Sequence, residues 1–253
     1  MTTVNDVLNV IAEKFPYELA GAGDKIGLMV GNGAAKVTKI VLAMDPSDEV
    51  IEFAVKNNAE LIITHHPIFF ENVTHFNDSQ ETTKRALKFA NNNINLISMH
   101  TNLDAGVGGL NDLICKKLGV SKDFEFCIGL CKGGNIESTT LRGFIEKVKT
   151  AFDCDFVLAV GYDDTPVNRV AVASGAGGSA ISSVFGKDID LFFTGEIKHD
   201  DARAARENGM MAVSVGHFAT ESICKEIYFD LLNNKFSGVE ILLATEKPSL
   251  VSK

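Results

Sequence analysis

Four of the six histidines stand directly after short apolar runs that we predict to be β-strands: His65, His66, His100 and His217. In α/β folds the carboxyl ends of parallel strands gather ligands, because loops and helix N-termini meet there. Imidazole nitrogens are good donors for zinc, iron, manganese, nickel and cobalt. The pattern therefore predicts a transition-metal site at the ends of these strands.

Carboxylates follow two of these histidines at the same spacing. Asp104 lies four residues after His100, and Glu221 lies four residues after His217. If a helical turn begins at the histidine, this spacing puts both side chains of a pair on one face. The combination of imidazole and carboxylate strengthens the prediction of a metal site.

The adjacent pair His65-His66 needs a separate explanation. Neighbours in an extended strand point to opposite faces, so a single ion would be reached by one of the two. Two ions about 3.5–4 Å apart remove this difficulty, since adjacent imidazoles can each bind one, and a carboxylate can bridge the ions. The alternative is a polar strand end whose rings are satisfied by backbone carbonyls. The additional strand ends that carry histidine or acidic residues favour two metals.

The elements that must position these side chains occur twice along the chain. The first series predicts strands at 39–45, 59–64 and 95–99, with helices at 47–58 and 81–92. The second series predicts strands at 169–174, 189–194 and 211–215, with helices at 179–185 and 200–207. Single residues match as well, because His100-x-x-x-Asp104 recurs as His217-x-x-x-Glu221. Equal order and shared residues indicate an internal duplication.

This duplication predicts an α/β protein of two similar lobes, with helices on mainly parallel or mixed sheets. We place the first lobe at 1–125 and the second at 126–253, and the C-terminal segment is a candidate to pack back on the first lobe. The joining segment predicts a turn at Gly133-Gly134, a helix at 138–152 and a strand at 156–160.

Composition narrows the class of partner. The 33 acidic and 24 basic side chains give a net charge of −9, and no block of five Lys or Arg occurs. Nucleic acid is therefore a poor partner, since phosphate contacts need cationic groups.

No apolar run approaches the ~18 residues that span a bilayer, and the first residues lack a signal-peptide pattern. We expect a cytoplasmic protein without membrane partners. The five cysteines contain no C-x-x-C, so they predict neither a disulfide framework nor a cysteine-rich zinc site.

Five motifs together resemble the Nif-three-like family, whose members are often labelled GTP cyclohydrolase I type 2 homologs. In chain order they are Gly23-Asp24-Lys25-Ile26-Gly27-Leu28-Met29-Val30-Gly31, Thr64-His65-His66-Pro67, His100-Thr101-Asn102-Leu103-Asp104-Ala105, Thr194-Gly195-Glu196-Ile197-Lys198-His199 and Gly216-His217-Phe218-Ala219-Thr220-Glu221. The resemblance implies two α/β lobes, a dinuclear metal site between them and a toroidal homohexamer.

The resemblance also implies roles for individual residues. By position, His65 and Asp104 would hold one divalent ion and His66 and His217 the other, with Glu221 as the bridge. His100 would then orient Asp104 or a bound water. The family commonly has a second histidine after the position of His199, where this chain has Asp200. We therefore leave His199 out of the ligand set.

Other residues near the predicted strand ends admit two readings. The loop Gly175–Ala180 fits G-x-G-x-x-A, which could cradle a phosphate, but a tight turn for helix packing is the favoured interpretation. Glu196 is a candidate proton carrier or an ion-pair partner. Asp24 and Asp45 are sufficiently explained as turn or cap residues and stay outside the predicted site.

The leading functional hypothesis is a metal-dependent hydrolase with two divalent transition-metal ions, acting on a small anionic or heterocyclic molecule. Ring opening of the cyclohydrolase type and phosphoester cleavage would use the same groups, with His100 and Glu196 as catalytic candidates. The alternatives are a non-catalytic metal-binding or regulatory protein, a purine-nucleotide binding module, or a helper that hands over a metal in cofactor biosynthesis.

Overall fold

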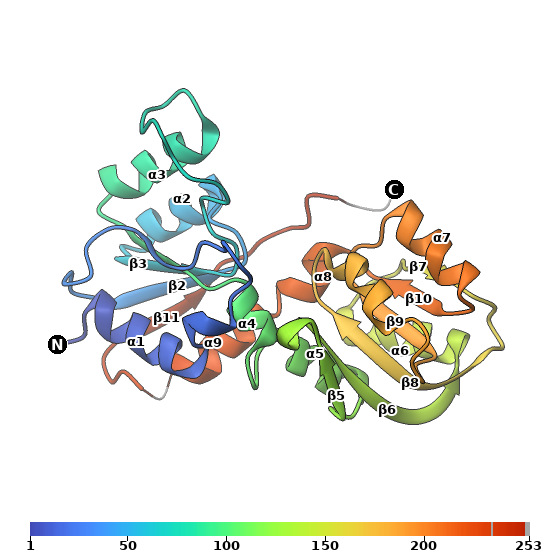
Figure 1. Cartoon of the computed structure of the whole chain (residues 1–253). Helices are drawn as coiled ribbons and strands as arrows, with labels where there is room; N and C mark the ends of the chain where they lie inside the picture. The colour runs from blue at the N-terminus through green and yellow to red at the C-terminus, as the bar shows by residue number, and fades with distance from the viewer. Residues whose placement is uncertain (234, 251–253) are drawn as a thin grey trace. The chain divides into compact units, whose positions relative to one another are not determined.

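The computed structural model describes residues 1–233 and 235–250 and divides the chain into two compact units. Unit 1 comprises Met1–Leu103 with Cys224–Lys247, and unit 2 comprises Asp104–Ile223 with the residues from Pro248 on. The chain thus changes unit within the short helix α4 (Thr101–Ala105) and again before α9 (Figure 1). Within the described residues, no helix is long and apolar enough to cross a membrane.

Unit 1 is a mixed sheet with helices on both faces (Figure 1). Its elements are α1 (Val4–Lys14), η1 (Tyr17–Leu19), β1 (Gly27–Val30), β2 (Lys39–Ala43), α2 (Asp48–Lys56), β3 (Leu61–Thr64), α3 (Glu81–Asn91), β4 (Asn95–Ser98), α9 (Cys224–Leu232) and β11 (Glu240–Leu243). The strands that the structure describes are ordered β1-β4-β3-β2-β11, with β1 antiparallel to β4 and the others parallel.

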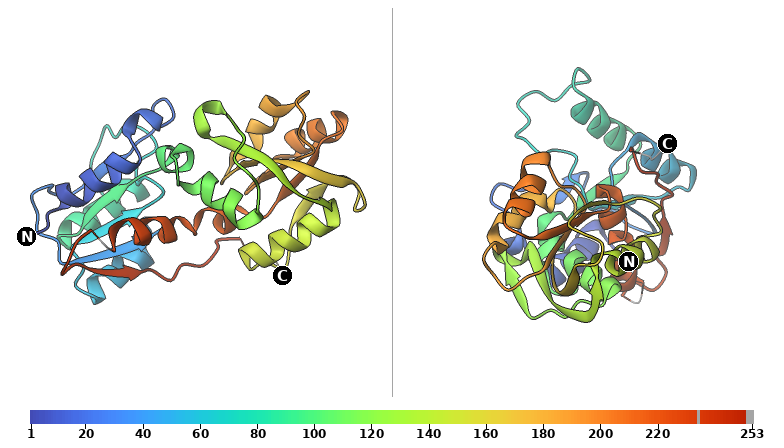
Figure 2. Two further views of the ribbon diagram at one scale, coloured as in Figure 1. Left: turned by 90° about the horizontal axis from the view of Figure 1, so that it is seen from below. Right: turned by 90° about the vertical axis from the view of Figure 1, so that its right-hand side faces the viewer.

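The core of unit 1 follows from strand alternation. Val41, Ile62 and Leu96 face α2 and α3, where they pack against residues such as Phe89. The opposite face is covered by α1 and α9, which contact each other and appear blue and red in the view from below (Figure 2). The predicted helix start at Ser47 is confirmed, since its side chain accepts a hydrogen bond from Val50 N.

Unit 2 repeats this plan. Its elements are α5 (Leu110–Leu118), β5 (Phe124–Phe126), η2 (Cys127–Gly129), β6 (Cys131–Thr140), α6 (Leu141–Phe152), β7 (Leu158–Val160), β8 (Pro166–Ala173), η3 (Gly177–Val184), β9 (Leu191–Thr194), α7 (His199–Glu207), β10 (Met211–Ser214) and α8 (His217–Glu221). The order of its described strands is β5-β6-β8-β9-β10-β7. Here β8, β9 and β10 are parallel, as β2, β3 and β4 are in unit 1.

Helices again cover both faces of this sheet. Phe192 and its neighbours on one face pack against η3 and α7, while Phe193 contacts Phe144 and Phe152 of α6 on the other. The predicted α/β class and the duplication of mixed sheets with helices are confirmed. In both units the central strands end in level register, with Ala43 beside Thr64 and Ala173 beside Thr194.

Local predictions differ from the structure at three places. The predicted turn at Gly133-Gly134 is wrong, because both glycines lie inside β6, where an added Cβ on Gly133 would collide with Val170 O. The start of the predicted helix at 138–140 also belongs to β6, so α6 begins at Leu141. The segment after Gly175 forms a 3-10 helix.

The unit boundary also differs from the predicted division at residue 125. Helix α5 packs on β6, β8 and α6, so the residues from Asp104 on belong with the second sheet. The C-terminal segment packs on unit 1, because β11 pairs with β2 and α9 contacts α1.

Candidate metal centre

His65 and His66 follow the last residue of β3. The strands on either side of β3, β2 and β4, end at the same level. The pairing of Thr64 with Ser98 places His65 next to the end of β4, where its Nδ1 lies 3.2 Å from Met99 O. A carbonyl oxygen only accepts, so Nδ1 carries the proton in this contact. His65 is fully buried, and the hydroxyls of Thr64 and Ser98 hold the strand ends together at 2.8 Å.

His66 is held from the other side by Asp45. The register that sets Ala43 beside Thr64 brings Asp45, two residues after β2, to the His66 ring. Nδ1 of His66 lies 2.7 Å from Asp45 Oδ1. The carboxylate thereby fixes the orientation of the ring.

His100 is held by Asp24. Strand β1 runs antiparallel to β4, so the turn before β1 lies beside the residue that follows β4. His100 Nδ1 is 2.8 Å from Asp24 Oδ1, and Thr101 donates to the same carboxylate from its backbone N (3.1 Å) and its hydroxyl. Burial raises the pKa of the Asp24 carboxyl, but the hydrogen bonds from His100 and Thr101 outweigh it and hold the pKa well below its usual value.

The three histidines form one cluster within unit 1. Their ring centroids are separated by 5.0 Å (His65 to His66), 5.2 Å (His65 to His100) and 5.6 Å (His66 to His100). One donor atom from each ring lies within 4.8 Å of the others. Because each Nδ1 meets an oxygen of the protein, the three rings are oriented, as imidazoles that bind or adjoin a transition metal usually are.

Phe70 lies on the edge of this cluster. Its ring centroid is 5.8 Å from that of His100, in an edge-on arrangement, and 6.4 Å from that of His66. The Phe70 side chain is nevertheless 62% exposed. An apolar ring at this position reduces the access of water to the imidazoles.

Unit 2 gathers a different set of donors after β10. His217 begins α8 and Glu221 ends it, and His217 Nε2 lies 2.8 Å from Glu221 Oε2. The other ring nitrogen, Nδ1, is 3.4 Å from Glu196 Oε1, which follows β9. Glu221 is almost fully buried, at 4% exposure, whereas the Glu196 side chain is half exposed. Glu196 thus lies beside the His217 ring, at a longer distance than the 2.7 Å between Asp45 and His66.

Asp104 is placed by the end of β8. Its side chain is buried, and Oδ1 accepts a hydrogen bond from Ser174 Oγ at 3.1 Å. Ser174 N in turn donates to Asn111 Oδ1 at 2.9 Å. The carboxylate is therefore carried by residues of unit 2.

Gly175 lets Glu221 and His217 approach the backbone. An added Cβ here would collide with Glu221 Oε1 and lie 3.2 Å from His217 Nε2, and the φ of +53° also favours glycine. Gly178 is similarly constrained, because its Cβ would collide with Glu196 O. These close approaches agree with the favoured interpretation of the Gly175–Ala180 loop as a packing turn.

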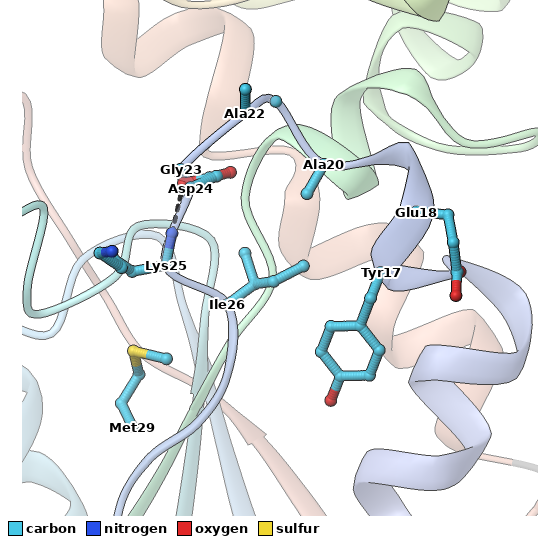
Figure 3. Close-up of a pocket in the computed structure, with 10 residues that line it drawn as sticks. Tyr17, Glu18, Ala20, Ala22, Gly23, Asp24, Lys25, Ile26 and Met29 are labelled. Carbon is cyan, nitrogen blue, oxygen red and sulfur yellow. Dashed lines mark hydrogen bonds between the residues drawn. The ribbon is translucent and has the colours of Figure 1, made fainter.

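A pocket of 510 Å³ adjoins the Asp24 turn in unit 1 (Figure 3). Its wall comes from η1, β1 and the segment between them, with Tyr17, Ile26 and Met29 as largely apolar side chains, Lys25 as a cation and Glu18 as an acidic group. Asp24 belongs to the same wall, and Lys25 N donates to its Oδ1 at 2.9 Å. The residue that holds His100 is therefore also part of a ligand-sized depression.

The structure thus brings His65, His66 and His100 together in unit 1, and His217, Glu221 and Glu196 together in unit 2. Sequence reasoning missed Asp45 and Asp24 as partners of the histidines. Asp45 was detectable in principle, because it follows the strand next to His65-His66. Asp24 carried no such signal, since the antiparallel pairing of β1 is not apparent from the sequence.

Comparisons with known proteins find relatives over almost the whole chain. The family model Duf34/NIF3 (NGG1p interacting factor 3) matches residues 2–249. A "GTP cyclohydrolase 1 type 2 homolog" of Lactococcus lactis is 32% identical over 242 residues, covering 93% of each chain. A Clostridium acetobutylicum protein of the same name is 29% identical and covers 99% of this chain and 95% of its own.

Solved structures share the fold. A Bacillus cereus protein related to NIF3 has a TM-score of 0.88 at 20% identity, covering 100% of this chain and 99% of its own. Reduced HcgD from Methanocaldococcus jannaschii has a TM-score of 0.84 at 28% identity, covering 96% of this chain and 97% of its own.

Proposed function

The chain belongs to the Duf34/NIF3 family, and on that premise we propose that it is a metal-dependent hydrolase with a dinuclear centre. Five side chains would hold two divalent transition-metal ions, of zinc, iron, manganese, nickel or cobalt: His65, His66, Asp104, His217 and Glu221. The substrate would be a small anionic or heterocyclic molecule.

The observation that carries this proposal is the histidine cluster of unit 1. Three imidazoles at neighbouring strand ends each meet an oxygen through Nδ1, from Met99, Asp45 and Asp24 respectively. Such partners fix the tautomer and raise the basicity of the remaining nitrogen, as is usual for metal-binding histidines. Three imidazoles oriented in this way are not expected at a polar strand end that binds no ligand.

The chemistry divides between the ions and the chain. When bound, a divalent ion lowers the pKa of a coordinated water to ~7 and stabilises negative charge on a reacting oxygen. The chain orients the donors and handles protons. His100 Nδ1 donates to the Asp24 carboxylate, which leaves the proton on Nδ1 and makes Nε2 the nitrogen that would accept a proton during the reaction. Glu196, the other catalytic candidate, lies 3.4 Å from His217 Nδ1, where it would either carry a proton or pair with the His217 ring.

The substrate class is supported by charge and by the names of relatives. Bound cations turn an acidic surface into one that attracts anions. The relatives' printed name points to a nucleotide such as GTP, and the pocket beside Asp24 offers Tyr17 for a ring and Lys25 for an anionic group. Ring opening and phosphoester cleavage both remain within this proposal.

Turnover on a substrate panel tests the hydrolase assignment. The protein loaded with zinc, manganese or ferrous iron should hydrolyse a nucleotide or phosphoester, and His66→Ala should abolish the rate. His75→Ala is the matched control, because His75 is exposed in the loop before α3 and should leave turnover unchanged. Saturable binding without turnover across the panel would replace the hydrolase by a non-catalytic metal-binding or metal-carrying protein.

We further propose that the chain forms a homohexamer in the cytoplasm, as the family resemblance implies. Large apolar side chains exposed in the segment after His66, namely Phe70, Val73 and Phe76, support self-association. Light scattering coupled to gel filtration should give six chains per particle. A particle of one chain at micromolar concentration would contradict this proposal.

A further inference from the structure

Glu246 lies just beyond the last strand of unit 1 and binds the backbone at the end of β2. Met44 N donates to its carboxylate at 2.9 Å (Oε2) and 3.1 Å (Oε1), and Asp45 N donates to Oε1 at 2.9 Å. The contact joins residues about two hundred positions apart in the sequence and is made within one unit.

This carboxylate is itself held in place. Lys225 of α9 lies 3.0 Å from Glu246 Oε2 and also donates to Ala244 O at 3.1 Å. The side chains of Glu246 and Lys225 are 8% and 17% exposed. A charge pair with so little contact with solvent is weakly screened, and its hydrogen bonds to the backbone fix its geometry.

The contact occurs where strand pairing ends. Leu243 is the last residue of β11 in register with β2, and Ala244 N still donates to Leu42 O. Beyond this point the N–H groups of Met44 and Asp45 have no strand partner, and Glu246 supplies the acceptor. Since buried backbone donors need an acceptor, the carboxylate fixes the Met44-Asp45 peptide.

That peptide carries two contacts that orient His66. Asp45 Oδ1 accepts a hydrogen bond from His66 Nδ1, and Met44 O accepts one from His66 N at 3.0 Å. The Asp45 side chain is 47% exposed, so surrounding packing does little to restrain it. Its position is therefore set mainly by its backbone, which Glu246 holds.

We propose that Glu246, fixed by Lys225, is a positioning residue of the metal centre that orients His66 through the backbone of Asp45. The inference rests on the proposed function, because it assigns His66 to a metal. It makes the C-terminal segment part of the centre, although this segment contributes no donor to it.

Metal-free protein with labelled histidine provides the most direct readout. In the wild type, the ¹⁵N spectrum of His66 should show a proton fixed on Nδ1. Glu246→Ala should shift this spectrum toward a mixture of tautomers, and it should weaken binding of Co²⁺ about 10-fold, the lower end of the range for partners of metal ligands. Glu246→Gln keeps one accepting oxygen, so its His66 spectrum and its Co²⁺ affinity should lie between those of the wild type and Glu246→Ala.

Two variants of β11 separate positioning from stability. Leu242→Ala removes apolar contacts with the core of unit 1 and should lower the melting temperature without changing the His66 spectrum. Glu240→Ala removes an exposed ion pair with Lys39 at the other end of the strand and should change neither quantity.

The outcomes separate the two proposals. A Glu246→Ala protein with the His66 spectrum and Co²⁺ affinity of the wild type overturns the positioning role. The same spectral change in Leu242→Ala also overturns it, since the effect would then reflect loss of stability. A wild type that binds no Co²⁺ while Glu246→Ala still changes the His66 spectrum contradicts the metal centre but supports the link from Glu246 to His66.

Discussion

The two units share a plan but use different chemistry at matching strand ends. Three parallel strands end in level register in both units, and in each unit the two residues after the first of these strands are held through their backbone N–H groups. In unit 1 the two backbone N–H groups after β2 donate to the carboxylate of Glu246. In unit 2 the corresponding groups of Ser174 and Gly175 donate to the neutral side chains of Asn111 and Thr220.

The candidate metal donors also differ in chemical type between the two units. Unit 1 offers imidazoles whose orientation depends on oxygens of Asp24, Asp45 and Met99. Unit 2 offers the carboxylates of Asp104 and Glu221, with His217 between two acidic groups. After duplication, one copy thus presents mainly imidazoles and the other mainly carboxylates. These are the two donor types that the proposed dinuclear centre would use.

The largest expected effect comes from breaking the buried ion pair of unit 2. Asp112 accepts from Lys132 at 3.0 Å, and both side chains are 6% exposed. Asp112→Asn leaves the lysine charge buried without its partner and should cost about 3–5 kcal/mol of stability. Denaturant titration measures this loss. Asp163→Asn is the control, because its pair with Arg142 is exposed and should matter little.

The same variant changes the response to acid. Burial raises the pKa of Asp112, but hydrogen bonds from Gly108 N and from Lys132 and Lys122 outweigh it and lower the pKa below its usual value. The ionised carboxyl therefore contributes stability above its unfolded pKa of about 4, and this contribution is lost as the pH falls. Asp112→Asn should flatten the acid side of the stability curve. An unchanged acid slope would contradict the lowered pKa.

Gly175→Ala should disable the donors of unit 2 selectively. The new Cβ would displace Glu221 and crowd His217, so we expect at least ~10-fold weaker metal binding while the His66 spectrum of unit 1 stays unchanged. Gly186→Ala is the matched control, since it has a φ of +70° but open space around an added Cβ. Equal losses of metal affinity in the two variants would assign the effect to backbone strain alone.

Asp45→Ala tests the corresponding support in unit 1. Loss of the carboxylate that holds His66 should weaken metal binding by about 10–100-fold. Isothermal titration with Zn²⁺ measures the change, and Asp78→Ala, in an exposed loop of the same unit, serves as control. Wild-type affinity in Asp45→Ala would show that His66 needs no fixed partner.

Glu196→Gln should have the smallest effect. Its oxygen is 3.4 Å from His217 Nδ1 and the side chain is half exposed, so we expect less than about a 10-fold change in Zn²⁺ affinity. A loss of Zn²⁺ affinity as large as that in Asp45→Ala would show that Glu196 matters to His217 as much as Asp45 matters to His66, and would contradict this ranking.

The sequence predicted what local patterns encode. The strands that end at Thr64 and Thr194, the Ser47 cap and the repeated order of elements were all readable from apolar runs and capping residues. Strand β6 was missed, because Gly133 and Gly134 resemble a turn and their need for close strand packing appears only in three dimensions. The 3-10 character of η3 was missed for a similar reason, since it depends on glycine contacts.

The positions of the candidate donors were predicted better than the residues that hold the donors in place. His65, His66, His217 and Glu221 occupy the expected strand ends or short helices. Asp24 and Glu246 act on the cluster through an antiparallel pairing and through a contact across nearly the whole chain. Neither relation leaves a spacing pattern, so one sequence cannot reveal it.

Native mass spectrometry of the metal-loaded protein tests the central claim most directly. The account predicts two divalent ions per chain in the wild type. His66→Ala in unit 1 and Glu221→Ala in unit 2 should each lose metal, and His75→Ala should retain both ions. A wild type that binds no metal, or a stoichiometry that His66→Ala and Glu221→Ala leave at two, would contradict the account.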